Sequence, residues 1–286
     1  TGGGARIGRL LRLGKRALAE PSSWRAAGNF LRTVDHLIVV GTGILDDFGV
    51  RVWNMPYDLY RWCRVARRVR TRLSFVSVGA GPILHPASRW LMVKTLRFAQ
   101  YRSYRDQLSR EYLASVGFFD HGDQVFPDLA FSLPDRHERG WRPAEYQPQT
   151  IGVGVMGYYG WRNSQQHGAH IYDEYVAKIG RFTAWLLEQG YAVHLLTGEI
   201  PTDQRPVQDV LQYLLSAVDL ETRSRVRVPE IIAPDDVFAA IAATDLVVAT
   251  RFHNVISALL LCRPVLSLGY SKKNDVLLAE MGMGQY

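Results

Sequence analysis

The chain has 286 residues, of which 47% are hydrophobic and 21% charged, with a formal net charge of +7. This composition excludes a disordered chain, and the length suits two domains better than one core. The excess of basic over acidic residues favours an anionic partner: a phosphorylated substrate, a nucleic acid or an acidic membrane surface. No basic cluster has the aromatic spacing typical of nucleic-acid binding, so we expect no nucleic-acid partner. Neither a membrane-spanning run nor a secretory signal is found, so we expect a cytoplasmic protein.

The amino-terminal stretch from Arg6 to Ala19 is basic and amphipathic. It is typical of a helix that packs its apolar side on a core, which we favour, or of one that lies on an anionic membrane surface. The second alternative would make the protein peripheral to the inner face of the membrane. Cys63 and Cys262 lie in apolar segments far apart, so we expect two buried thiols without a disulfide. The chain opens at Thr1, and both ends resemble mid-chain sequence, so we expect a fragment of a longer protein.

Residues 34–40 predict the first strand, which runs into a glycine turn and an acidic pair. Glycines directly after a parallel strand let a ligand or a neighbouring backbone come close, which makes Gly41 and Gly43 candidate site residues. Asp46 and Asp47 would then stand at the edge of the same crevice. The alternative is a tight strand-to-helix turn in which one of these aspartates caps the helix.

Residues 61–72 alternate basic and apolar side chains at helical spacing, which predicts an amphipathic helix with a solvated basic face. Residues 73–78 predict the second strand, which also ends in a glycine turn. His85 lies three residues beyond that turn and is a candidate site residue by position only. Strands and helices continue to alternate along the chain, which predicts parallel sheets with right-handed crossovers.

We divide the chain into an N-terminal domain at residues 1–135, a linker at residues 136–149 and a C-terminal domain at residues 150–286. The linker is polar, contains prolines and has no periodicity. His167 and His170 are three residues apart, before a long predicted helix, but no third ligand is near in sequence. We therefore expect no metal site.

The segment from Thr244 to Tyr270 carries the strongest functional pattern: a strand, a charged turn, an apolar helix and a second strand. Ligands of an open parallel sheet bind outside the carboxyl ends of its strands, where Arg251 and His253 fall. A helix that starts near Asn254 would point its N–H groups at a phosphate or carboxylate there. Arg251 adds a permanent cation, and His253 adds a group that exchanges protons near neutral pH. The alternative is that Arg251 caps or pairs on the surface and His253 bonds to the backbone.

Arg251-Phe252-His253 at the start of an apolar helix, followed by residues 264–270 and then Lys272-Lys273, resembles the C-terminal signature of the polysaccharide pyruvyl transferase family. The resemblance implies an enzyme that moves the enolpyruvyl carbons of phosphoenolpyruvate onto a sugar as a ketal and releases phosphate. It implies an α/β fold of two doubly wound, Rossmann-like domains with parallel sheets, facing each other across a cleft as in GT-B glycosyltransferases. Neither cofactor nor metal is implied, since phosphoenolpyruvate is the co-substrate.

The resemblance also implies roles for single residues. His253, kept protonated by the anionic ligand, would protonate the methylene carbon of phosphoenolpyruvate, and Asp46 or Asp47 would accept the hydroxyl proton of the sugar. Many family members carry an arginine where this sequence has Met156, so Arg162 becomes the expected replacement. The expected substrate-binding residues are Gly41, Gly43, His85, Arg162, Arg251, Asn254, Tyr270, Lys272 and Lys273.

The implied partners are phosphoenolpyruvate and a saccharide or lipid-linked saccharide, in the biosynthesis of an exopolysaccharide of the cell envelope. Two alternatives stay open. One is a GT-B nucleotide-sugar glycosyltransferase, although the paired glutamates that retaining members often carry are not found in the second domain. The other is a non-catalytic sugar- or phosphate-binding relative in polysaccharide assembly, which the loss of the arginine at Met156 favours. Binding of phosphoenolpyruvate distinguishes these functions.

Overall fold

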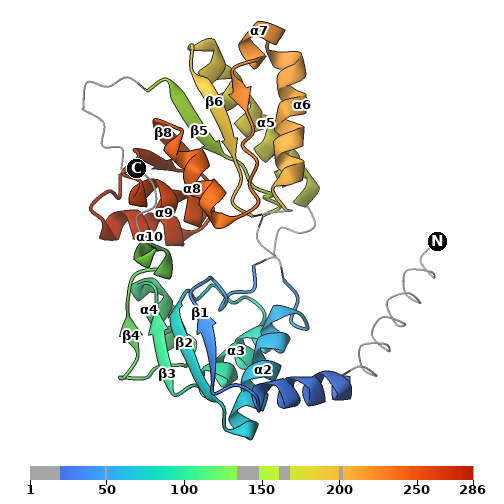
Figure 1. The fold of residues 1–286 in the computed structure, drawn as a ribbon, viewed down its shortest axis with the longest axis vertical. Coiled ribbons are helices and arrows are strands. Elements are labelled where there is room, and N and C mark those ends of the chain that lie inside the picture. Colours follow the sequence, from blue (N-terminus) through green and yellow to red (C-terminus); the bar gives the residue numbers. More distant parts are fainter. Residues whose placement is uncertain (1–19, 49, 134–147, 161–167, 200–201, 286) are drawn as a thin grey trace, which may run out of the picture. The chain divides into compact units, whose positions relative to one another are not determined.

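A computed structural model of the chain describes residues 20–48, 50–133, 148–160, 168–199 and 202–285 (Figure 1). The chain divides into two units, residues 1–129 and residues 130–286. The amphipathic stretch at residues 6–19, Arg162 and most of the expected linker lie outside the described residues. The domain boundaries expected from the sequence stay a prediction.

The first unit contains a four-stranded parallel sheet whose strands lie in chain order. Its strands are β1 (His36–Val40), β2 (Arg72–Val78), β3 (Tyr101–Tyr104) and β4 (Gln124–Val125). They alternate with helices α2 (Met55–Val69), α3 (Pro86–Leu96) and α4 (Gln107–Ser115), and the short 3-10 helix η1 (Leu129–Ser132) follows β4. β1 and β2 pair in register from His36 opposite Arg72 to Val40 opposite Val76. Because all strands are parallel, the turns that follow them share one edge of the sheet.

The core of the first unit lies between the sheet and its helices. Leu73 and Phe75 of β2 alternate toward this side and pack with Cys63 of α2 and Met92 of α3. Burial raises the pKa of the Cys63 thiol to about 12, so the thiol stays protonated at neutral pH. The expectation of a buried thiol is confirmed at this position.

The second unit contains a five-stranded parallel sheet in the order β7-β6-β5-β8-β9. Its strands are β5 (Thr150–Gly154), β6 (Ala192–Leu196), β7 (Val226–Arg227), β8 (Leu246–Ala249) and β9 (Val265–Ser267). Its helices are α5 (Gly168–Glu188), α6 (Gln204–Ala217), α7 (Leu220–Arg223), α8 (Pro234–Ala242), α9 (Phe252–Leu260) and α10 (Lys272–Glu280). The strand order reverses between β5 and β8, and a crevice opens at the carboxyl ends of the strands at such a switch point.

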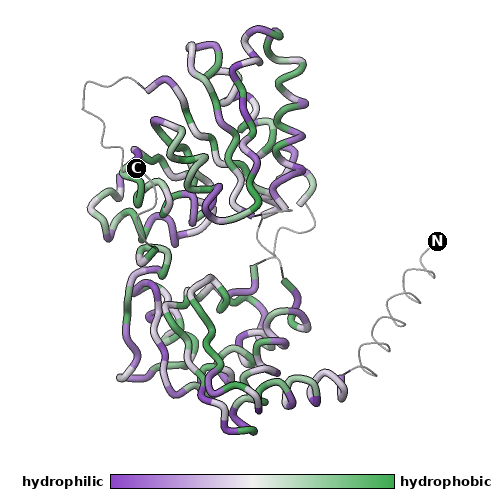
Figure 2. Tube along the Cα trace, viewed as in Figure 1, coloured by the Kyte–Doolittle hydropathy of each residue, from purple (hydrophilic) through white to green (hydrophobic). Residues whose placement is uncertain are grey.

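Two hydrophobic cores lie against the second sheet. Side chains of β5 and β6 pack with α5 and α6, including Val153, Leu195, Leu187 and Val210. The other core joins β8 and β9 to α8, α9 and α10. Figure 2 shows hydrophobic and hydrophilic residues alternating along the helices, as amphipathic packing on a sheet requires.

The mixed α/β fold class with parallel sheets is therefore confirmed. The expectation for Cys262 was wrong, because this side chain is exposed at the turn that ends α9. Its apolar neighbours in sequence belong to the helix before it, and the backbone turns at Cys262 with a φ of 51°. Helix α10 was not predicted, since its sequence has no regular apolar spacing.

We expect Leu187→Ala to lower the free energy of unfolding of the second unit by about 2–5 kcal/mol, because Leu187 is fully buried and the cavity would not close. Urea titration followed by circular dichroism measures this loss as a lower midpoint at an unchanged slope. The matched control is Leu215→Ala on α6, where the side chain is 52% exposed and little should change. Equal effects of the two variants would contradict the core described for this unit.

Candidate functional site

The predicted C-terminal site residues gather in the second unit at the carboxyl edge of its sheet. Arg251 directly precedes α9 as its N-cap residue, and His253 and Asn254 lie in the first turn of that helix. Tyr270 follows β9, and Lys272 begins α10. The starts of two helices and a group of cationic side chains therefore share the edge beside the switch point between β5 and β8.

The Arg251 guanidinium is held by two carboxylates from the loop after β6. Its Nη2 lies 2.5 Å from Oδ1 of Asp203, and its Nε donates to Oδ2 of the same carboxylate at 3.2 Å. Its Nη1 lies 2.6 Å from Oε2 of Glu199. Burial alone would lower the pKa of Arg251, but the hydrogen bond and charge of Asp203, with the charge of Glu199, raise it. Arg251 is therefore a fixed cation whose orientation is set inside the unit.

Asp203 is a fully buried carboxylate that joins three loops of this edge. Besides Arg251, it accepts hydrogen bonds from the backbone N–H groups of Gly198 and Glu199, each at 3.0 Å, and of Gly157 at 3.3 Å. These donors follow β6 and β5, whereas Arg251 follows β8. Sequence reasoning missed Asp203, whose position before α6 is that of an ordinary helix cap. In the structure its side chain makes no capping hydrogen bond to α6.

Aromatic side chains form a second part of the edge. The Tyr270 ring lies 6.3 Å from Tyr158 and has the Lys273 ammonium 4.8 Å above its centroid. Tyr158 in turn contacts Tyr175 of α5, whose hydroxyl accepts a hydrogen bond from the Met156 N–H at 3.1 Å. Burial raises the pKa of Tyr175, so its hydroxyl stays protonated. Tyr158 and Tyr175 were not among the predicted site residues.

His253 and Asn254 differ sharply in exposure. The imidazole of His253 is exposed on the first turn of α9, with its ring 5.6 Å from Phe252. Asn254 is fully buried, and neither its Oδ1 nor its Nδ2 has a hydrogen-bond partner among the described residues. A Cβ at Gly198 would lie 3.0 Å from that Oδ1, so glycine leaves room for the amide. Burying an amide without a hydrogen-bond partner costs free energy, so Asn254 marks an energetically unfavourable polar site in the first turn of α9.

In the first unit, Asp47 from the segment after β1 and His85 from the segment after β2 are brought together. The Asp47 carboxylate is buried and accepts hydrogen bonds from the backbone N–H groups of Leu84 and His85, each at 2.9 Å. The His85 ring caps α3, since its Nδ1 accepts from the Ala87 N–H at 3.1 Å. These contacts give both residues a structural role, and their roles toward a substrate stay predictions.

Asp46 is half-buried, and its Oδ1 accepts from the Phe48 N–H at 3.1 Å. A Cβ at Gly43 would lie 3.2 Å from the other oxygen of Asp46, so the glycine and the acid share one turn. Gly41 is needed for a different reason: a Cβ there would lie 2.7 Å from the Ser77 carbonyl oxygen. The close approach is thus to a neighbouring backbone, which was one of the two alternatives for this turn.

The carboxyl edge of the first sheet also holds a buried arginine. Arg105 follows β3, and its guanidinium lies 3.3 Å from Asp128 and 3.4 Å from Asp106. Asp106 caps α4 through the Ser109 N–H. Asp128, which follows β4, is thus a buried counter-charge of Arg105.

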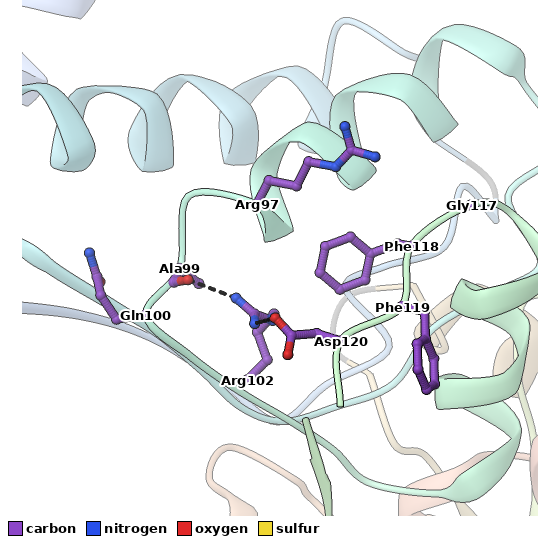
Figure 3. Close-up of a pocket in the computed structure, with 8 residues that line it drawn as sticks. All are labelled: Arg97, Ala99, Gln100, Arg102, Gly117, Phe118, Phe119 and Asp120. Atoms are coloured by element: carbon purple, nitrogen blue, oxygen red, sulfur yellow. Dashed lines mark hydrogen bonds and ion pairs between the residues drawn. The ribbon is translucent and has the colours of Figure 1, made fainter. Parts of the chain in front are cut away.

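A hollow of about 460 Å³ lies at the opposite, amino edge of the first sheet (Figure 3). Its Arg102 binds Asp120 at 2.6 Å and Asp123 at 2.8 Å and stacks on the Phe118 ring. The hollow contains none of the predicted site residues, and its central cation is already neutralised. It is therefore separate from the candidate site.

In the part of the chain that the structure describes, no group of three or more His, Cys, Asp or Glu side chains is arranged to hold a metal ion. The expected absence of a metal and of a cofactor stays a prediction. Over the same residues, no helix is long and apolar enough to cross a bilayer.

A family model described as polysaccharide pyruvyl transferase matches residues 7–272. No curated protein matches the chain in sequence. Among solved structures, the chain is similar to HepE of Anabaena in complex with UDP and glucose, at 16% identity and a TM-score of 0.50, covering 85% of this chain and 61% of that one.

It is also similar to UDP-GlcNAc 2-epimerase of Neisseria meningitidis bound to UDP-GlcNAc, at 14% identity and a TM-score of 0.55, covering 90% of this chain and 66% of that one. For MnaA of S. aureus with UDP the identity is 14% and the TM-score 0.52, covering 92% and 72%. The chain thus spans less than two thirds of the length of the first two proteins. At these identities the likeness concerns the fold, and it agrees with Rossmann-like units of the GT-B kind.

We expect Asp203→Asn to destabilise the second unit by about 3–5 kcal/mol, because the change leaves the Arg251 cation without its buried counter-charge. The new amide would also turn a donor toward N–H groups that now donate to the carboxylate. Thermal unfolding measures the change. The matched control is Glu174→Gln, which breaks an exposed pair with Lys178 and should change little. A melting temperature equal to that of the unaltered protein would refute the role given to Asp203.

Proposed function

The chain belongs to the polysaccharide pyruvyl transferase family, a family of transferases that modify polysaccharides, and we propose that it uses phosphoenolpyruvate as the donor. The enolpyruvyl group passes to two hydroxyls of one sugar as a ketal, and phosphate is released. The acceptor is a saccharide or lipid-linked saccharide. The observation that carries this proposal is the placement of Arg251 and His253 at the start of α9, beside Lys273 and Tyr270.

Donor binding needs clustered cations, because phosphoenolpyruvate carries a carboxylate and a phosphate. Arg251 offers a forked guanidinium, and the N–H groups at the start of α9 add a partial positive charge. Lys272 is exposed at the start of α10, and the Lys273 ammonium stands over the Tyr270 ring. These groups belong to one unit, so donor recognition does not depend on how the two units are arranged.

Glu199 is the group that an anionic donor must replace. Its carboxylate is 55% exposed and pairs with Nη1 of Arg251, whereas Asp203 is buried and holds the other edge of the guanidinium. The Arg251 side chain is only 17% exposed, whereas Glu199 can return to water, so a donor carboxylate or phosphate can replace Glu199 at Nη1 and keep the guanidinium paired. Asp203 keeps the guanidinium in place during this exchange.

His253 serves as the acid in this proposal. It gives a proton to the methylene carbon of phosphoenolpyruvate, which becomes a methyl group and leaves a cationic centre at C2. A sugar hydroxyl attacks C2 and loses its proton to a base, for which Asp46 stays the candidate of the first unit. The bond between C2 and the phosphate oxygen then breaks, and a second hydroxyl attacks C2 and passes its proton to the leaving phosphate, which closes the ketal.

We expect calorimetric titration of phosphoenolpyruvate into the protein to show binding that Arg251→Lys weakens about tenfold or more, because an ammonium cannot hold Asp203 and the donor together. His253→Gln should keep the affinity but abolish phosphate release with saccharide acceptors. The lysine is chosen because it leaves Asp203 a counter-charge, and unfolding curves confirm that each variant is folded. A folded protein that ignores millimolar phosphoenolpyruvate but binds a UDP-sugar would make the glycosyltransferase alternative correct.

We expect Glu199→Gln to tighten phosphoenolpyruvate binding several-fold, because it removes both the competing carboxylate and its repulsion of the donor. Glu188→Gln, an exposed change at the end of α5, removes the same charge away from the site and serves as the control. Titration at two ionic strengths separates local competition from a general field effect. Weaker binding by Glu199→Gln would mean that Glu199 holds the ligand instead of being displaced by it.

A further inference from the structure

Positive charge is concentrated in one continuous part of the first unit. Residues 59–105 contain ten arginines and one lysine but no aspartate or glutamate. Since the whole chain carries a net charge of +7, the remaining residues are net negative. This segment includes most of α2, all of β2 and α3, and β3. Arg61, Arg102 and Arg105 are paired with carboxylates outside this segment. Exposed arginines such as Arg64 and Arg67 still give the surface of α2 a positive charge, which attracts anions.

Two helices of this segment place matching stripes of cations and aromatic rings side by side. Residues separated by three or four positions share one face of a helix. On α2 such a stripe contains Tyr60, Arg64 and Arg67, and on α3 it contains Trp90 and Lys94. Phe98, just after α3, completes what we call the α2–α3 seam, consisting of Tyr60, Arg64, Arg67, Trp90, Lys94 and Phe98.

Aromatic and cation–π contacts within and between the two helices hold the seam together. The Tyr60 ring lies 6.0 Å from Trp90 and 5.8 Å from Phe98. The guanidinium carbons of Arg64 and Arg67 lie 5.9 Å and 5.6 Å from the Phe98 centroid. The Lys94 ammonium lies 5.9 Å from the Trp90 centroid, so each cation is positioned by an aromatic ring. The three cations are thus held beside aromatic rings of the same two neighbouring helices.

The seam faces solvent. Trp90 is 55% exposed, and Arg64 and Arg67 are exposed on the neighbouring helix. α3 contains no acidic residue, and the acidic residue of α2, Asp58, is bound to Arg61 at 3.1 Å. An exposed indole among cations that have no carboxylate partner on their own helices needs an explanation other than packing.

We propose that the α2–α3 seam docks on the surface of an anionic phospholipid bilayer. Indole and phenol rings prefer the interface between water and lipid, and lysine and arginine bind anionic headgroups there. Because α2 and α3 are neighbours, the exposed cations and rings of both helices are available to the same partner surface. The seam is distinct from the basic stretch at residues 6–19, and the inference does not depend on the reaction that the second unit performs.

The test is co-sedimentation of the protein with phosphatidylcholine vesicles, with and without phosphatidylglycerol. We expect binding only to the vesicles that contain phosphatidylglycerol, with a loss at high salt. The triple variant Arg64→Gln, Arg67→Gln, Lys94→Gln should lower the partition coefficient by about tenfold or more, since each basic residue near an anionic surface contributes to binding. Trp90→Ser should lower it several-fold at unchanged charge.

The matched control is the triple variant Lys178→Gln, Arg181→Gln, Arg205→Gln, which removes the same charge from exposed positions of α5 and α6. Its partition coefficient should stay close to that of the unaltered protein. Equal losses in the two triple variants would show that only net charge matters and would overturn the proposal. Unchanged binding in the seam variant would also overturn it, because the contact would then lie elsewhere. So would a protein that does not bind the vesicles but binds a DNA duplex through the seam.

Discussion

The pairing of Asp203 with Arg251 is the interaction on which the geometry of the candidate site depends. One buried carboxylate holds the guanidinium that precedes α9 and also binds the turns after β5 and β6. These three loops follow β5, β6 and β8, which lie on both sides of the switch point. β5 and β8 are neighbours in the sheet but are not consecutive in the chain. A buried charge of this kind is stable only when fully paired. The position of Arg251 is therefore a property of the whole sheet edge, and the start of α9 is fixed with it.

Fixing the arginine in this way has a chemical consequence. A guanidinium paired on one edge by a buried carboxylate keeps its orientation while its other edge exchanges partners. The net charge near Arg251 is low with Glu199 in place, so the attraction for an anion comes also from the N–H groups at the start of α9 and from the lysines of α10. We therefore expect specific binding of an anion to depend on several of these donors together and not on Arg251 alone.

The sequence located Arg251 and His253 because their signal is local: a β-branched strand, a charged turn and an apolar helix follow one another without interruption. Parallel strands also follow from alternation alone. Asp203 could not be found this way, since its partner Arg251 lies 48 positions away and the local pattern is that of a helix cap. For Asp47 the sequence left capping and catalysis open, and the structure adds two backbone donors 37 and 38 positions away. Contacts between residues so far apart in the sequence depend on tertiary packing, which the periodicity of the sequence does not predict.

The carboxyl edges of the two sheets use their charged residues differently. In the first unit, Arg105 is buried between Asp106 and Asp128, and Asp47 binds backbone N–H groups, so the charged groups there stabilise turns. In the second unit, His253 and Lys272 are exposed at the same kind of edge. Proton transfer requires a group that can reach a ligand and change its charge without unfolding its surroundings. Exposure and position are therefore the observations that support the proposed roles of His253 and Lys272 in the second unit.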